Sequence, residues 1–181
     1  QEQITGTDLD PDQVFAAISR LHERVEGSYA AIALIAGHGL LAFRDPFGIR
    51  PLVLGRRNAD FVGAEWVVAS ESLVLESAGY EVVRDVAPGE AIFITPNGEM
   101  HSRQCAANPR LLPCSFEYVY LARPDSVMNG ISVYEARLRM GDRLADTIAK
   151  YTPSGAIDVV MPIPDSSRPA DMQVARKLGI E

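Results

Sequence analysis

The spacing of apolar residues divides the chain into two stretches of different character. Near the start, apolar positions recur at intervals of four, three and four residues, at Val14, Ile18, Leu21 and Val25. This spacing places them on one face of a helix. Asp10 can cap that helix, Pro11 suits its first turn and Gln13 can complete a capping box. We therefore predict a helix that begins at Pro11 and is terminated by Gly27.

Short apolar stretches separated by turn residues follow this helix. They predict strands over residues 29–36, 40–44, 51–55, 66–69, 81–86, 91–95 and 99–104. Gly37-His38-Gly39 and Pro96-Asn97-Gly98 are hairpin turns that join neighbouring strands. A short helix is expected from Ser70, with Gly79 at its end. This region is therefore predicted to be antiparallel sheet with helices before and within it.

The pattern changes after residues 108–113, which carry two prolines and no periodicity and are the best candidate linker. A capping box at 132–135 starts a long helix, residues 157–161 form a continuous apolar run, and a second helix is expected at about 170–178. Helix, buried strand and helix in this order are typical of α/β structure with a parallel sheet. We predict one domain over residues 1–112 and a second over 113–181.

Composition narrows the function classes. The 181 residues carry a net charge of −7, a pI of about 5.0 and only two lysines, Lys150 and Lys177. Binding to nucleic acid needs clustered basic residues, and binding to a membrane surface needs a basic amphipathic helix, so we expect neither partner. Cys105 and Cys114 match no zinc spacing and are too few for a disulfide framework. They predict structural thiols in a reducing, cytoplasmic compartment.

The apolar run at 157–161 leads into a polar loop, Asp165-Ser166-Ser167-Arg168, just before the last helix. Ligands of open α/β sheets bind at the carboxyl ends of strands, and helix N-termini present unpaired amides to anions. The loop is therefore a candidate phosphate-binding site. In the simpler alternative, its hydroxyl and carboxylate groups only cap the helix.

Several motifs resemble one enzyme family. The run Arg-Asp-Pro-Phe-Gly-Ile-Arg-Pro-Leu at 44–52, with Ala-Ser-Glu-Ser at 69–72, is similar to glutaminase domains of class II amidotransferases. Phe-Glu-Tyr-Val-Tyr-Leu-Ala-Arg-Pro-Asp-Ser at 116–126, Ile-Ser-Val-Tyr at 131–134 and Pro-Ile-Pro-Asp-Ser-Ser at 162–167 resemble the glutamine phosphoribosylpyrophosphate amidotransferases. The resemblance extends from about Asp12 to the end of the chain.

The resemblance implies an α+β fold. It would comprise the C-terminal part of an αββα N-terminal-nucleophile glutaminase, followed by the first α/β elements of a type I phosphoribosyltransferase. The family releases ammonia from glutamine and joins it to phosphoribosyl pyrophosphate, making phosphoribosylamine for purine synthesis. It further implies that Asp165, Ser166, Ser167 and Arg168 bind substrate, and that Ser166 faces Mg²⁺. We also expect a homo-oligomer.

The family's nucleophile is an N-terminal cysteine, whereas residue 1 here is glutamine. We therefore expect an internal fragment with no catalytic residue of its own, inactive alone. Cys114 matches a position that ligates an iron–sulfur cluster in some members, but a cluster normally needs four thiolates, so we do not expect one. Two other functions stay open: another amidotransferase with the same type of nucleophile, and a non-catalytic module that binds a nucleotide or a partner.

Several other polar residues have a plain structural explanation. Arg44, Asp45, Arg50 and Glu71 could contact substrate, but turns with internal ion pairs and helix starts use the same residue types more often. Tyr118, Tyr120 and Arg123 stand where the resemblance places the join between domains. They could line a route between the sites, or the tyrosines could be core residues of a strand, since they alternate.

Overall fold

The computed structural model describes residues 9–58 and 63–180. The chain forms two compact units, Gln1–Pro113 and Cys114–Glu181, so the boundary lies at the end of the proline-containing segment 108–113. No helix among the described residues is long and apolar enough to cross a membrane.

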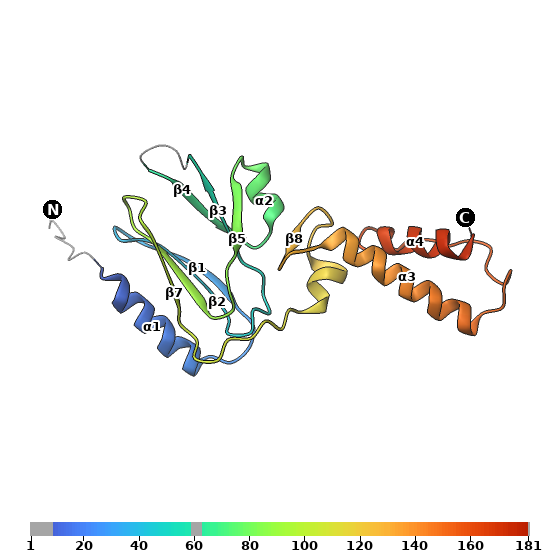
Figure 1. Cartoon of the computed structure of the whole chain (residues 1–181), viewed down its shortest axis with the longest axis horizontal. Coiled ribbons are helices and arrows are strands. Elements are labelled where there is room, and N and C mark those ends of the chain that lie inside the picture. Colours follow the sequence, from blue (N-terminus) through green and yellow to red (C-terminus); the bar gives the residue numbers. More distant parts are fainter. Residues whose placement is uncertain (1–8, 59–62, 181) are drawn as a thin grey trace. The chain divides into compact units, whose positions relative to one another are not determined.

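The first unit contains two open antiparallel sheets and two helices (Figure 1). The four-stranded sheet has the order β1 (Ala30–Ile35), β2 (Gly39–Arg44), β6 (Glu90–Ile94), β7 (Met100–Gln104). The three-stranded sheet has the order β4 (Glu65–Ala69), β3 (Val53–Arg57), β5 (Glu81–Asp85). Helix α1 spans Pro11–Arg24 and α2 spans Ser72–Ser77.

Successive side chains of β2 and β6 pack into two different clusters, one on each face of their sheet. Leu41 and Phe43 of β2 pack with Phe15 of α1 in one cluster, and Ala42 packs with Leu54 of β3 in another. Successive strand residues point to opposite faces, so the four-stranded sheet has α1 on one face and the three-stranded sheet on the other. Helix α2 follows β4 and contacts β4 and β5. The order is helix, sheet, sheet and helix, as the resemblance implied.

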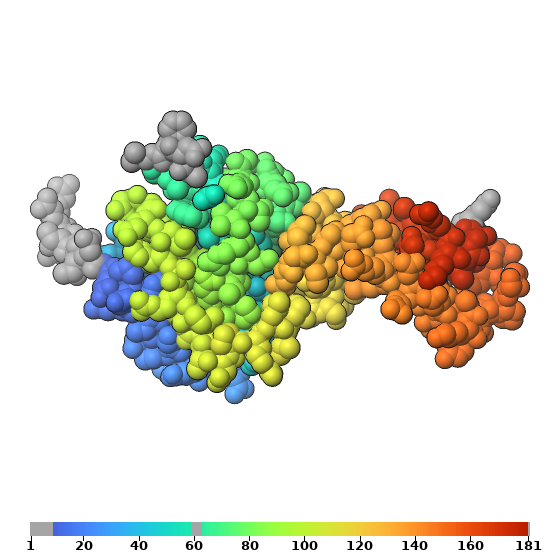
Figure 2. Space-filling view, viewed as in Figure 1, coloured from blue at the N-terminus to red at the C-terminus, as the bar shows by residue number. Residues whose placement is uncertain are grey.

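The second unit is mainly helical among the described residues. It contains a π-helical turn, η1 (Glu117–Leu121), a two-residue hairpin of β8 (Val127–Met128) and β9 (Ile131–Ser132), and helices α3 (Val133–Tyr151) and α4 (Arg168–Leu178). Figure 2 shows α3 in orange and α4 in red packed against each other. The contact is close at Gly141, where an added Cβ would lie 2.4 Å from the Ala170 carbonyl oxygen. Only glycine fits this position without a shift.

The predicted starts of α1 and α3 are confirmed by their caps. The Asp10 carboxylate accepts a hydrogen bond from the Asp12 amide at 2.9 Å, and the Ser132 hydroxyl accepts one from the Glu135 amide at 3.3 Å. Each satisfies an amide that the first helical turn leaves unpaired. Two other helix boundaries are less well predicted: α1 stops at Arg24 rather than at Gly27, and α2 begins at Ser72 rather than at Ser70.

The predicted buried strand over residues 157–161 is wrong for this structure. These residues form no strand, and Val159 and Met161 are 55% and 78% exposed. A parallel strand is buried only when neighbouring strands and helices cover it, and no strand within residues 9–58 and 63–180 pairs with this run. An apolar run alone therefore did not determine a strand.

Of the two alternatives for Tyr118 and Tyr120, a pair of core residues on a strand is not what the structure shows, because both lie in the helical turn η1. Tyr118 is buried with Ala122, four residues on, while Tyr120 is 60% exposed. Burial at a spacing of four is helical, and the alternation of tyrosines concealed it.

Candidate functional site

A cleft of about 720 Å³ lies within the second unit and contains most of the predicted loop. One wall is formed by the segment after η1, including Arg123 and Pro124, together with Tyr120. The other is formed by Asp165, Ser166 and Arg168, with Met172 of α4 beyond them. The structure thus brings three of the four predicted site residues together with Tyr120 and Arg123. Ser167 is in the same turn but does not line the cleft.

Contacts inside the loop hold its shape. The Arg168 guanidinium pairs with the Asp165 carboxylate, with 3.0 Å between Nε and Oδ1, and both side chains are largely exposed. The Ser167 hydroxyl donates to the Ile163 carbonyl oxygen at 2.6 Å, and the Arg168 amide lies 3.4 Å from the Asp165 carbonyl oxygen. These bonds close a tight turn directly before α4.

The simple capping explanation fits the loop poorly. Ser167 occupies the N-cap position of α4, but its side chain makes no capping hydrogen bond. Its backbone carbonyl instead accepts the Asp171 amide at 2.9 Å. Ser166 is half-buried at the cleft, one position before the cap. The hydroxyl of Ser166 is therefore available for a role other than starting the helix.

Oxygen donors at this loop suit a hard cation better than a soft one. The Ser166 hydroxyl is a neutral oxygen ligand of the kind that Mg²⁺ accepts when it keeps most of its waters and bridges phosphate oxygens. The described residues contain no group of three or more His, Cys, Asp or Glu side chains that could hold a metal by themselves.

The opposite wall carries a second positive charge. Arg123 lies in the cleft and approaches Asp125, with 3.6 Å between Nη2 and Oδ2, and both side chains are about two-thirds exposed (67% and 60%). An exposed ion pair of this kind contributes little to stability, about 0–1 kcal/mol, and can exchange partners at low cost. Arg168 and the buried Arg137 also line the cleft, so three guanidinium groups border it, which suits an anionic ligand.

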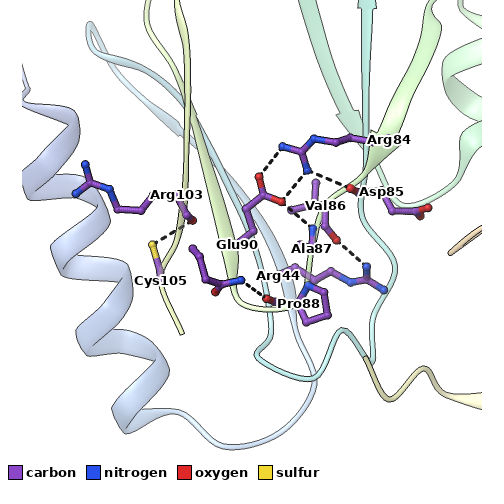
Figure 3. Close-up of polar contacts among 10 residues, drawn as sticks. Arg44, Arg84, Asp85, Val86, Ala87, Pro88, Glu90, Arg103 and Cys105 are labelled. Carbon is purple, nitrogen blue, oxygen red and sulfur yellow. Dashed lines mark hydrogen bonds and ion pairs between the residues drawn. The ribbon is translucent and has the colours of Figure 1, made fainter. Parts of the chain in front are cut away.

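The corner at Arg44 and Asp45 in the first unit is a structural site. Arg44 is 1% exposed and donates to the carbonyl oxygens of Arg50, Val86 and Gly48 at 2.7, 2.7 and 2.8 Å. Asp45 is fully buried and accepts from the amides of Phe47, Ile49 and Arg50 at 2.9–3.2 Å. Backbone groups of the turn thus hold both side chains in place at this corner. Figure 3 shows Arg44 reaching Val86.

Two further sequence candidates, Arg50 and Glu71, also lie in the first unit. Arg50 contributes its backbone carbonyl and amide to the corner. Glu71 is the N-cap residue of α2 and makes no side-chain capping bond.

A partly buried ion pair that the sequence did not indicate joins the two sheets (Figure 3). Arg84 of β5 donates to both carboxylate oxygens of Glu90 at 2.7 and 2.6 Å, and the Ala87 amide donates to the same carboxylate at 2.8 Å. Glu90 is 6% exposed, and its bonds raise the pKa of Arg84. The pair is bidentate and charge-assisted, the stronger kind of protein hydrogen bond.

The two cysteines differ in environment. Cys105 is buried and packs beneath α1, and burial raises the pKa of its thiol. Cys114 is half-buried. Both are free thiols, and a raised pKa makes Cys105 a poor nucleophile because the thiolate is the reactive form.

Comparison with known proteins gives a consistent result. No family model matches the chain. Amidophosphoribosyltransferases of Pseudomonas aeruginosa and Escherichia coli are each 53% identical to it over 94% of the chain, and that of Schizosaccharomyces pombe is 44% identical over 93%. The structure of glutamine phosphoribosylpyrophosphate amidotransferase from B. subtilis with ADP and GMP matches 98% of the chain, with a TM-score of 0.78 and 33% identity.

The helix–sheet–sheet–helix unit and the helical unit with its polar loop match one part of the fold of a solved amidotransferase. The chain is homologous over nearly its whole length to one segment of amidophosphoribosyltransferase. It spans about a third of the length of these relatives, 34% of each curated protein and 35% of the solved chain.

Proposed function

We propose that the chain is part of an enzyme that makes 5-phosphoribosylamine from phosphoribosyl pyrophosphate and ammonia released from glutamine, the first step of purine biosynthesis. The first unit would belong to the glutaminase and the second to the phosphoribosyltransferase. The observation that carries this proposal is the cleft around Asp165, Ser166 and Arg168, inside a segment that is 53% identical to named amidophosphoribosyltransferases.

In this reaction the ammonia nitrogen bonds to C1 of the ribose while the bond from C1 to the pyrophosphate oxygen breaks. The bonding electron pair leaves with pyrophosphate, so negative charge develops on the leaving group. Fixed positive groups that are already in place stabilise this charge without reorganising. We assign that role to Arg168 and the loop backbone, held in shape by the contacts of Asp165 and Ser167.

Mg²⁺ would enter with the substrate's phosphate groups and neutralise part of their charge. Ser166 would hold the cation or one of its waters through its hydroxyl oxygen. Asp165 lies next to it, and its carboxylate would keep Arg168 oriented toward the cleft. The chain itself would thus supply few of the cation's ligands, in agreement with the single suitable hydroxyl at this loop.

The test is Ser166→Ala in an enzyme of the relatives' full length that contains this segment. Phosphoribosylamine formation should fall by about tenfold, the effect of losing one contact worth about 1.4 kcal/mol. Glutamine hydrolysis measured without phosphoribosyl pyrophosphate should stay unchanged. Ser154→Ala removes a hydroxyl from an exposed loop of the same unit and serves as the control. Wild-type rates of both reactions in Ser166→Ala would contradict the assignment.

Assembly into a homo-oligomer and a cytoplasmic location also remain predictions. Light scattering on the purified full-length enzyme tests the first, and fractionation of cells that express it tests the second.

A further inference from the structure

Arg137 is a charged side chain in the interior of the second unit, and the proposed reaction assigns it no role. It projects from α3 and is 3% exposed. Desolvation lowers the pKa of its guanidinium, and the residue is one of the few buried charged groups in the described chain. Burying a charge is costly unless hydrogen bonds compensate, so its bonding partners indicate what it does.

The partners of Arg137 are two carbonyl oxygens of the η1 region. Its Nε donates to Tyr118 O at 2.8 Å and its Nη2 donates to Ala122 O at 2.8 Å. The last carbonyls of a helical turn have no partner within the turn. The planar guanidinium spans two of them at once, so it fixes the orientation of the turn and not only its position.

The turn that Arg137 holds forms one wall of the cleft. In the sequence Tyr120 lies between the two residues whose carbonyls are bonded, and Arg123 directly follows the second of them. Both line the cleft, as does Arg137. The turn is anchored further by the Tyr118 hydroxyl, which donates to Met128 O at 3.2 Å. These bonds leave the exposed side chains of Tyr120 and Arg123 at the surface of a fixed backbone.

The second wall is fixed to the same helix, four residues further along. Gly141 lies against Ala170 of α4, two residues after the loop ends at Arg168. Residues four apart lie on one face of a helix. One face of α3 therefore holds the η1 wall through Arg137 and the loop wall through Gly141, and sets the separation between them.

We infer that Arg137 is a positioning residue for phosphoribosyl pyrophosphate: by binding the η1 carbonyls it holds Tyr120 and Arg123 at the distance from Ser166 and Arg168 that the substrate requires. This inference rests on the proposed function of the cleft. It assigns Arg137 no contact with substrate. Misplacing a wall of a site by about 1 Å can cost up to 100-fold in activity, so the effect is measurable.

The experiment compares Arg137→Met, Arg137→Lys and Arg139→Met in the full-length enzyme that contains this segment. Arg139 is exposed on the same helix, so Arg139→Met removes the same charge without the carbonyl contacts. Arg137→Met should raise the KM for phosphoribosyl pyrophosphate by about tenfold or more, while glutamine hydrolysis without that substrate is unchanged. Arg137→Lys, which can still bind one carbonyl, should recover part of the loss.

Hydrogen exchange gives a second readout that does not depend on activity. The amides of residues 118–123 should exchange faster in Arg137→Met than in Arg139→Met, and phosphoribosyl pyrophosphate with Mg²⁺ should restore less protection. A KM equal to that of Arg139→Met would overturn the inference. So would an equal loss in both reactions without recovery by lysine, which would mark Arg137 as a general stability residue.

Ser166→Ala in the same series separates this inference from the one it rests on. If Ser166→Ala weakens substrate binding and Arg137→Met does not, the cleft is the substrate site and Arg137 does not position it. If neither variant changes substrate binding, the assignment of the cleft fails, and the role of Arg137 fails with it.

Discussion

Replacing Glu90 tests whether the ion pair in Figure 3 fastens the two sheets of the first unit. Glu90→Ala removes the acceptor of two Arg84 bonds and one Ala87 bond. Losing one partner of a fully buried pair costs about 3–5 kcal/mol. Arg84 is 39% exposed and can turn toward water, which lowers the expected loss to about 2–3 kcal/mol. Glu90→Gln keeps two acceptor bonds and should cost about 1–1.5 kcal/mol.

The assay is urea unfolding followed by tryptophan fluorescence. Trp66 is the single tryptophan of the chain and lies in β4, so the signal reports the first unit and not the second. The control is Glu81→Ala, because Glu81 on β5 pairs with Arg56 at 3.4 Å and both side chains are well exposed. That variant should lose no more than about 0.5 kcal/mol. If Glu90→Ala lowers the free energy of unfolding no more than Glu81→Ala does, the Arg84–Glu90 ion pair does not hold the two sheets together.

Three further predictions concern single residues. Gly141→Ala should lower the free energy of unfolding by about 1–3 kcal/mol, because the new methyl group would meet the Ala170 backbone. Unfolding followed by circular dichroism measures this loss, and wild-type stability would show that α4 moves away from α3 without cost. Cys105 should react with iodoacetamide more slowly than Cys114 between pH 7 and 9, about the range in which ordinary thiols ionise, because burial raises its pKa and lowers its thiolate fraction; equal rates in Cys105→Ser and Cys114→Ser would disprove this. Burial lowers the pKa of His22 below its ordinary 6.5, so the imidazole binds its proton at a higher pH in the unfolded chain than in the folded one. The contribution of neutral His22 to stability should therefore be complete above pH 6.5 and fall as the pH drops below it. In His22→Gln this part of the pH dependence should be absent.

The local features of this fold could be predicted from the sequence. Capping by Asp10 and Ser132 follows from residue type and spacing within a few positions, and so do the hairpins of the first unit. These features depend on neighbours in the chain. The alternation of β2 and β6 between two clusters likewise follows from their period of two.

The features that the sequence failed to predict depend on partners distant in the chain. Whether residues 157–161 form a strand depends on strands beside them, which the apolar run does not encode. The bonds of Arg84 to Glu90 and of Arg137 to η1 depend on how separate elements meet. At the candidate site, residue types identified Asp165, Ser166 and Arg168, but only the structure shows that they share a cleft with Tyr120 and Arg123.

The most direct test of the central claim is calorimetric titration of Mg²⁺-pyrophosphate into the full-length enzyme that contains this segment. The wild type and Ser154→Ala should bind it with the same affinity. Ser166→Ala should bind it about tenfold more weakly, because one oxygen contact to the hydrated cation is lost. If all three proteins bind Mg²⁺-pyrophosphate equally, the loop at 165–168 is not its site and the account is contradicted.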